Sequence, residues 1–127
     1  MRYLTPVICL LFQVAGHAAP VPVAAAEINY LLSTVSNSDC RFYRNGTWYD
    51  AKSAAAHLRY KYENLAAKDL IRDAEDFIDK AATKSSSTGL AYAIKCPDAA
   101  ESSSREWLRK LLALYRQSRP DMLSTIP

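Results

Sequence analysis

The fold is organised around the stretch Cys40-Arg41-Phe42-Tyr43-Arg44-Asn45-Gly46-Thr47-Trp48-Tyr49-Asp50. Its centre, Asn45-Gly46, is the strongest short signal for a β-hairpin, because both central residues of a type I′ turn need a positive φ angle. Side chains alternate between the two faces of a strand, so Cys40 and Phe42 are expected on a buried face. Arg41 and Tyr43 are then expected on the opposite face, which is aromatic and basic, with Arg44 near the turn. Asn45-Gly46-Thr47 also has the form of a glycosylation sequon, but we interpret it as the turn.

Apolar residues at helical spacing lie on both sides of this hairpin. They predict helices over residues 27–37, 51–67, 74–84 and 104–116. Asp50, Asp73 and either Ser103 or Ser104 are expected to cap three of these helices. A third strand is expected over residues 90–96, with a buried face made of Leu90, Tyr92, Ile94 and Cys96, and a polar loop over residues 98–103. The predicted fold class is α+β, a small antiparallel sheet (the β-hairpin plus a third strand) packed against about four helices in the order α-β-β-α-α-β-α.

The first 26 residues have the pattern of a secretory signal peptide. Arg2 provides the positive charge, an apolar core follows, and small residues precede Glu27. Cleavage is expected after Ala26, with a second plausible position after Ala18. The apolar run is shorter than the ~20 residues that span a bilayer, so no stable membrane insertion is expected after cleavage. Residues 27–116 then form a single domain and residues 117–127 a loosely ordered tail, in a soluble protein located in the periplasm.

Three cysteines and a small net charge limit the possible classes of function. Cys9 lies inside the predicted leader, which leaves Cys40 and Cys96 as a disulfide pair in an exported protein. The entropy of closing so long a loop gives this cross-link about 4 kcal/mol. A formal net charge of +3 is too small to indicate a nucleic-acid partner. We expect neither a metal site nor a cofactor, because one histidine remains after the leader and no glycine-rich phosphate loop is present.

Arginine and aromatic side chains are dense in and after the hairpin. The candidate binding residues are Arg41, Tyr43, Arg44, Trp48, His57, Arg59 and Lys61. Such residues dominate contact energies at interfaces, which indicates a non-enzymatic binding module for an envelope protein or an anionic glycan. An ordinary solvated face with tyrosine rings packed on it explains the same residues, and both interpretations stay open here. No catalytic residue is assigned.

An enzyme is the alternative function. His57 as base and the Ser85–Ser87 run as nucleophile would suit a small hydrolase or transferase. The chain has no G-x-S-x-G motif, and no acid is clearly placed to orient His57. A lone histidine beside an apolar helix face is more often a structural hydrogen-bonding group.

Short stretches spread over residues 27–108 carry a resemblance to a known family. They are Glu27-Ile28, Leu31-Leu32, Ser38-Asp39-Cys40-Arg41-Phe42, Arg44-Asn45-Gly46, Ala56-His57-Leu58-Arg59, Lys61-Tyr62, Ala74-Glu75-Asp76-Phe77-Ile78, Lys84-Ser85-Ser86, Gly89, Tyr92, Cys96 and Trp107-Leu108. These stretches resemble a family of small exported proteobacterial proteins called YfeK-like, whose domain has no known function. Asp73 stands where the family is expected to have threonine, and both residues can cap a helix. The resemblance implies export and the cysteine pair, and it implies no activity.

Overall fold

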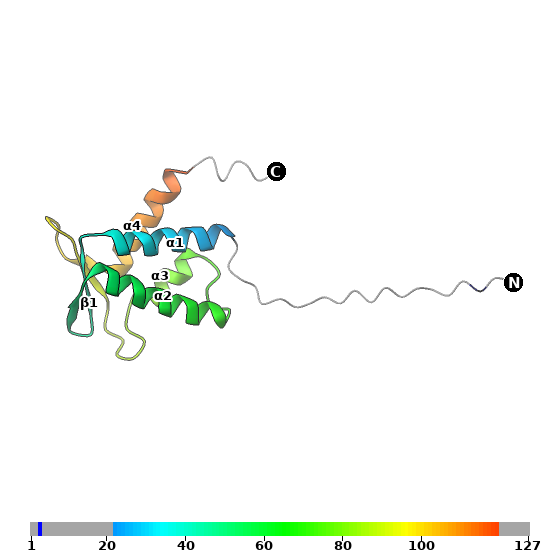
Figure 1. Ribbon diagram of the computed structural model, residues 1–127, viewed down its shortest axis with the longest axis horizontal. Coiled ribbons are helices and arrows are strands. Elements are labelled where there is room, and N and C mark those ends of the chain that lie inside the picture. The colour runs from blue at the N-terminus through cyan, green and yellow to red at the C-terminus, as the bar shows by residue number, and fades with distance from the viewer. Residues whose placement is uncertain (1–2, 4–21, 120–127) are drawn as a thin grey trace.

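The computed structural model describes residue 3 and residues 22–119. The described residues form four helices and one four-stranded antiparallel sheet (Figure 1). The elements are α1 (Pro22–Asn37), β1 (Arg41–Arg44), β2 (Thr47–Tyr49), α2 (Ala51–Ala67), α3 (Ala74–Ala81), β3 (Ala93–Lys95), β4 (Ser102–Ser103) and α4 (Ser104–Gln117). Figure 1 shows the sheet at one end of the molecule, with α1 and α2 running away from it side by side. The α+β class and the predicted order of the main elements are confirmed.

The hairpin has the predicted turn. Asn45 and Gly46 have φ angles of 50° and 86°, the positive values that a type I′ turn requires. Phe42 pairs with Tyr49, and Tyr43 pairs with Trp48, across β1 and β2. The sheet order is β2-β1-β3-β4, so the third predicted strand lies against β1 as expected.

Helix ends follow the expected capping chemistry. The carboxylate of Asp50 accepts a hydrogen bond from the amide of Ser53 at 2.8 Å, and Asp73 accepts one from Asp76 at 2.7 Å. Ser103 caps α4, because its hydroxyl accepts from the amide of Glu106 at 3.1 Å. Each of these bonds satisfies a backbone donor that the first turn of a helix leaves unpaired.

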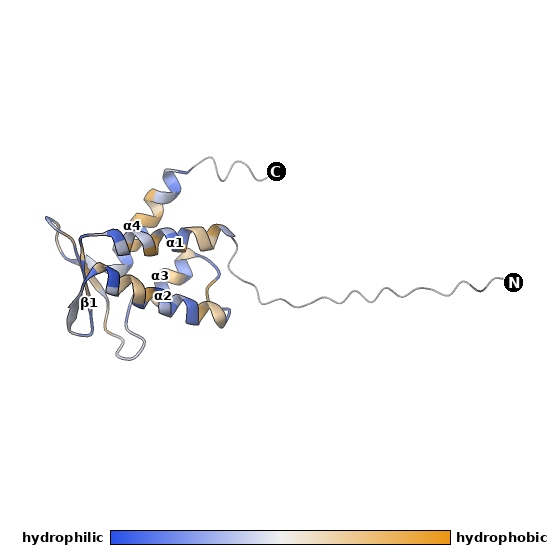
Figure 2. Ribbon diagram, in the orientation of Figure 1, coloured by the Kyte–Doolittle hydropathy of each residue, from blue (hydrophilic) through white to orange (hydrophobic). Residues whose placement is uncertain are grey.

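The core lies between the helices and the inner face of the sheet. Each helix carries both apolar and polar residues, visible as orange and blue segments in Figure 2. The largest fully buried side chains are Phe77, Ile28, Leu31, Leu32, Ile71, Ile78, Ile94, Leu108 and Val35. Phe42 joins this core from β1 and meets the ring of Trp107 edge-on, at 6.3 Å between ring centroids. The sheet therefore presents one face to the helices and keeps the other free of them.

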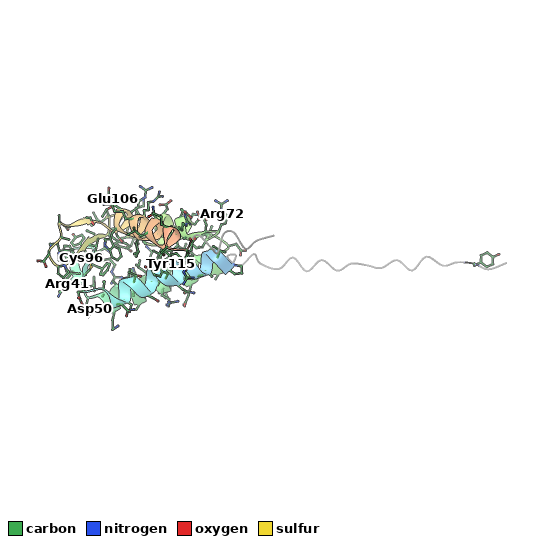
Figure 3. The ribbon with its side chains drawn as sticks, turned by 90° about the horizontal axis from the view of Figure 1, so that it is seen from above. Arg41, Asp50, Arg72, Cys96, Glu106 and Tyr115 are labelled. Carbon is green, nitrogen blue, oxygen red and sulfur yellow. A yellow bond between two sulfur atoms is a disulfide. The ribbon has the colours of Figure 1, made fainter. Side chains whose placement is uncertain are left out.

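A disulfide joins the sheet at the start of β1 and the end of β3. Cys40 and Cys96 are bonded across 56 positions of sequence, which confirms the predicted pair. The bond lies next to the paired residues Arg41 and Lys95, so it fixes the register of the two strands at that end. Figure 3 shows Arg41 and Cys96 together at the end of the molecule that carries the sheet.

Two element boundaries differ from those predicted. Helix α1 begins at Pro22 instead of Glu27, because Ala24, Ala25 and Ala26 are good helix formers and Ala24 is only 3% exposed. Helix α3 ends at Ala81 instead of Lys84. The hydroxyl of Thr83 donates to the carbonyl of Ile78 at 2.7 Å, and its own carbonyl accepts from the amide of Tyr92 at 2.9 Å.

The region around the third strand also needs correction. Leu90 was expected on the buried face but is 52% exposed, because regular pairing with β1 begins only at Ala93. Residues 98–103 were expected to be a loop throughout. Their last two residues instead form β4, in which Ser102 and Ser103 pair with Ile94 and Ala93.

Most of the predicted leader and of the predicted tail lies outside the described residues. Residues 1–2, 4–21 and 120–127 are not described, so the cleavage site and the loose order of the tail stay predictions. None of the helices within the described part is long and apolar enough to cross a membrane.

Candidate functional site

The strand register divides the predicted site residues between the two faces of the sheet. Arg44 shares a face with Phe42 and therefore points towards α2 and the core side. Arg41, Tyr43 and Trp48 point the other way, because they alternate with these residues along β1 and β2. The hairpin therefore carries two separate candidate sites.

The first candidate is the outer sheet face, which we define as Arg41, Tyr43, Trp48, Ala93 and Lys95. The rings of Tyr43 and Trp48 lie 5.4 Å apart at 60°, and Trp48 is 38% exposed. Arg41 is paired directly with Lys95 across the two strands, and both are exposed. Like charges at paired positions are unfavourable for the sheet. The ammonium of Lys95 donates to the backbone carbonyls of Cys96 and Ala99. The outer sheet face thus combines an aromatic platform with two cations from neighbouring strands.

The second candidate is a basic cluster, which we define as Arg44, His57, Lys61 and Tyr92. Arg44 Nη1 lies 2.7 Å from His57 Nδ1, and His57 Nε2 lies 3.3 Å from the hydroxyl of Tyr92. Lys61 Nζ donates to the same hydroxyl at 3.1 Å and to the carbonyl of Lys84 at 3.0 Å. Strand β1, helix α2, and the segments that hold Lys84 and Tyr92 therefore contribute to one hydrogen-bonded group.

The direction of these hydrogen bonds follows from the chemistry of the groups. A guanidinium can only donate, so Nδ1 of His57 must accept from Arg44. The ring is then neutral and carries its hydrogen on Nε2, which donates to the oxygen of Tyr92. Lys61 can also only donate, so the Tyr92 oxygen accepts two hydrogen bonds. The hydrogen of the Tyr92 hydroxyl is left to be given to another group.

Burial and mutual repulsion of the cations set the electrostatics of the basic cluster. Burial, followed by the charges of Arg44 and Lys61, lowers the pKa of His57 below its usual value. Burial, with a smaller contribution from Arg44, also lowers the pKa of Lys61. Burial raises the pKa of Tyr92, and the charge of Arg44 opposes that rise. Burial, the largest cause in each case, favours the neutral form of all three groups, and the neighbouring cations lower the pKa values of His57 and Lys61 further.

No carboxylate within residues 22–119 pairs with Arg44 or Lys61. Arginines elsewhere do have such partners: Arg116 binds Glu27 at 2.6 Å and Arg109 binds Asp79 at 2.9 Å. Arg44 instead lies over the ring of Tyr49, 4.5 Å from its centroid. The half-buried positive charge of the basic cluster is therefore not neutralised by the chain's described side chains.

A small hollow opens beside the basic cluster. It measures about 30 Å³, and its walls include Arg44, Tyr49, His57, Tyr92 and the apolar side chain of Leu58. A space of that size holds one or two water-sized groups. It can admit a small polar group.

Arg59 belongs to neither candidate site. It is exposed on α2 and borders a separate depression with Lys52 and residues of α1. Tyr92 belongs to the basic cluster but was not predicted as a site residue. The alternating pattern of residues 90–96 correctly placed its ring towards the core, and that pattern contains no signal for the role of its hydroxyl.

The serine run binds the hairpin turn and not the histidine. Asn45 Nδ2 donates to the hydroxyl of Ser85 at 3.1 Å, and Thr88 Oγ1 donates to Asn45 Oδ1 at 2.6 Å. Ser85 is only 4% exposed and also contacts the hydroxyl of Ser87 at 3.0 Å. Both ring nitrogens of His57 have other partners, so the base–nucleophile contact of a hydrolase is not formed among the described residues.

Fold and sites together define a small α+β domain with one disulfide, an open sheet face and a half-buried basic cluster. The chain belongs to a family of unknown function, DUF5329, whose model matches residues 22–116. It is similar to the "Uncharacterized protein YfeK" of Salmonella typhimurium, with 35% identity over 92 residues that cover 72% of this chain and 75% of that protein. No solved structure matches the chain. The resemblance to the YfeK-like family is thus confirmed.

Proposed function

We propose that this protein is an exported, periplasmic and non-enzymatic binding module whose outer sheet face binds an anionic glycan. The leader pattern of residues 1–26 and the disulfide support export, because disulfides persist in oxidising compartments. The single observation that carries the binding proposal is the aromatic pair Tyr43–Trp48 beside the opposed cations Arg41 and Lys95.

The size of the outer sheet face favours a glycan over a protein partner. Its strands have two to four residues each. At ~3.4 Å per residue and ~4.8 Å between strands, such a face covers at most about 200 Å². A standard protein interface buries about 800 Å² on each partner. One or two sugar rings fit the available area.

The chemistry of the outer sheet face favours an anionic glycan over a neutral one. Aromatic rings present apolar faces on which the C–H face of a sugar ring can pack. An acidic group of the glycan placed between Arg41 and Lys95 would also gain charge-assisted hydrogen bonds from these cations. A neutral sugar would gain only the first of these contributions.

A fluorescence titration tests this function. Tetragalacturonate should change the emission of exposed Trp48, and the affinity should fall as salt is added. Maltotetraose, a neutral glycan of the same length, should bind at least about tenfold more weakly. Equal binding of the two glycans, or no binding of either, would refute the proposal.

Matched variants show whether the response comes from the outer sheet face. Trp48→Ala and Arg41→Ala should each abolish detectable capture of the anionic glycan, measured calorimetrically. Tyr60→Ala and Arg59→Ala are the controls, because Tyr60 and Arg59 are exposed on α2 and lie outside this face. A control variant that loses as much affinity as Trp48→Ala would count against a site on the sheet.

A further inference from the structure

We propose that the basic cluster is a second, separate site, which binds the carboxylate of one small organic acid. It lies on the opposite side of the sheet from the outer face, since Arg44 and Tyr43 are consecutive in β1. Tyr43 and Ala93 of the outer sheet face also border the hollow, but none of the four residues of the basic cluster belongs to that face. Variants of the basic cluster therefore test this proposal separately from glycan binding.

The hydrogen-bond pattern of the basic cluster contains more donors than acceptors. Arg44 gives one N–H to His57, His57 gives its N–H to Tyr92, and Lys61 gives N–H groups to Tyr92 and to the carbonyl of Lys84. The hydroxyl hydrogen of Tyr92, a third hydrogen on Lys61 and further hydrogens on Arg44 have no acceptor among these contacts. Tyr92 is itself only 7% exposed. A ligand that accepts hydrogen bonds suits these donors, and the positive charge around the hollow favours an anion.

The size and the lining of the hollow favour a small carboxylate as the ligand. Arg44, His57 and Tyr92 border it, and about 30 Å³ admits a carboxyl group but not a bulky ligand. The other walls include the apolar side chains of Phe42, Ala54 and Leu58, which suit a short hydrocarbon better than a fully hydrated phosphate. A guanidinium also matches the planar geometry of a carboxylate with two parallel N–H groups.

Binding at this site is coupled to the protonation of His57. A carboxylate that recruits Arg44 releases Nδ1 of His57, and its negative charge favours the imidazolium form. The groups that face His57 are Arg44 from β1, Tyr49 from β2, Lys61 on α2 and Tyr92 before β3, and none of them is acidic. The ligand therefore supplies the first negative charge in this environment, and the pKa of His57 rises when it binds.

Nuclear magnetic resonance of the imidazole protons measures both binding and protonation. The probes are propionate, inorganic phosphate and chloride at matched ionic strength, with a His57→Gln variant to assign the signals of His57. Propionate should produce saturable shifts and raise the pKa of His57, whereas chloride should not. Saturable binding of phosphate without binding of propionate would overturn the assignment to carboxylates. An absence of saturable shifts with either probe would overturn the site itself.

Two variants attribute binding to the cluster. Tyr92→Phe removes only the hydroxyl, and Lys61→Gln removes the charge of the side chain that donates to Tyr92 and to the carbonyl of Lys84. Each should weaken propionate binding about tenfold or more, while Tyr60→Phe and Arg59→Gln leave it unchanged. If both cluster variants retain wild-type spectra and wild-type affinity, propionate binds elsewhere and the proposal is wrong.

Discussion

Removing the cross-link between Cys40 and Cys96 should cost this domain about 4 kcal/mol of unfolding free energy. The bond closes a loop of 56 positions, and the entropy of the unfolded chain rises when that loop is opened. Small domains are stable by only ~5–15 kcal/mol in total. For a domain of this size 1 kcal/mol corresponds to roughly 4–8 °C in Tm, so the midpoint should fall by about 15–30 °C.

Thermal unfolding followed by circular dichroism compares three samples: oxidised protein, reduced protein and the double variant Cys40→Ala/Cys96→Ala. Reduced protein keeps both sulfur atoms, so its difference from oxidised protein measures the cross-link alone. The difference between reduced protein and the double variant measures the packing of Cys40, which is only 7% exposed. Reduced protein that melts within about 5 °C of oxidised protein would refute the loop-entropy reasoning.

Hydrogen exchange locates the effect. The disulfide lies at one end of the β1–β3 pair, whereas α1 and α3 are held by buried apolar contacts. Reduction should therefore raise the exchange of amides in β1 and β3 before it affects the helices. Exchange that rises first in the helices would contradict the assignment of the disulfide to the sheet.

Four further outcomes are expected. Gly46→Ala should lower the unfolding free energy measured by chemical denaturation by about 1 kcal/mol, because φ is +86° at this position. No atom lies within 4 Å of an added Cβ, so the cost comes from the backbone conformation and not from a clash. An unchanged denaturation midpoint would contradict this prediction. Arg116→Met should destabilise the domain by about 1–3 kcal/mol, because it leaves the buried carboxylate of Glu27 without the guanidinium that binds it. Adding Glu27→Gln should restore most of the lost stability, and no recovery in this double-mutant cycle would count against the ion pair. The unfolding free energy should decrease as the pH falls below about 6.5, because the pKa of His57 is lowered in the folded protein and the unfolded chain therefore takes up the proton first. The His57→Gln variant should lack this part of the pH dependence, and a pH profile identical to that of the wild type would refute the prediction. Amino-terminal sequencing of the exported protein should find Glu27 as the first residue, whereas a start at Ala19 would place the cleavage upstream of α1.

Local rules were sufficient for the hairpin and the helix caps. The φ requirement of Asn45-Gly46, the capping carboxylates of Asp50 and Asp73 and the alternation around Phe42 each depend on neighbouring residues only. The predictions failed where tertiary contacts decide. The pairing of Ser102 and Ser103 with β3 and the contacts of Thr83 after α3 both involve another segment of the chain, beyond the reach of a helix or strand pattern.

The candidate sites show the same division. Alternation correctly separated Arg41 and Tyr43 from Phe42, which defined the outer sheet face. The basic cluster joins Arg44 to His57 across 13 positions, and His57 to Tyr92 across 35. The helical pattern places His57 on α2 and the strand pattern places Arg44 and Tyr92, but no local pattern indicates that these side chains come into contact.

The hydrogen bonds that join Asn45 of the hairpin turn to Ser85 and Thr88 have a consequence for deamidation of the turn. Asn-Gly sequences lose ammonia when the following amide nitrogen attacks the side-chain carbonyl carbon. Here the amide of Asn45 is bound on both sides, donating to Ser85 and accepting from Thr88, which restricts the rotation that this attack needs. Deamidation would turn the donor to Ser85 into an acceptor and place a new negative charge beside Arg44, at the edge of a cluster whose described side chains include no acid. Ser85, which lies 40 residues further along the chain, and Thr88 should therefore slow deamidation of this turn.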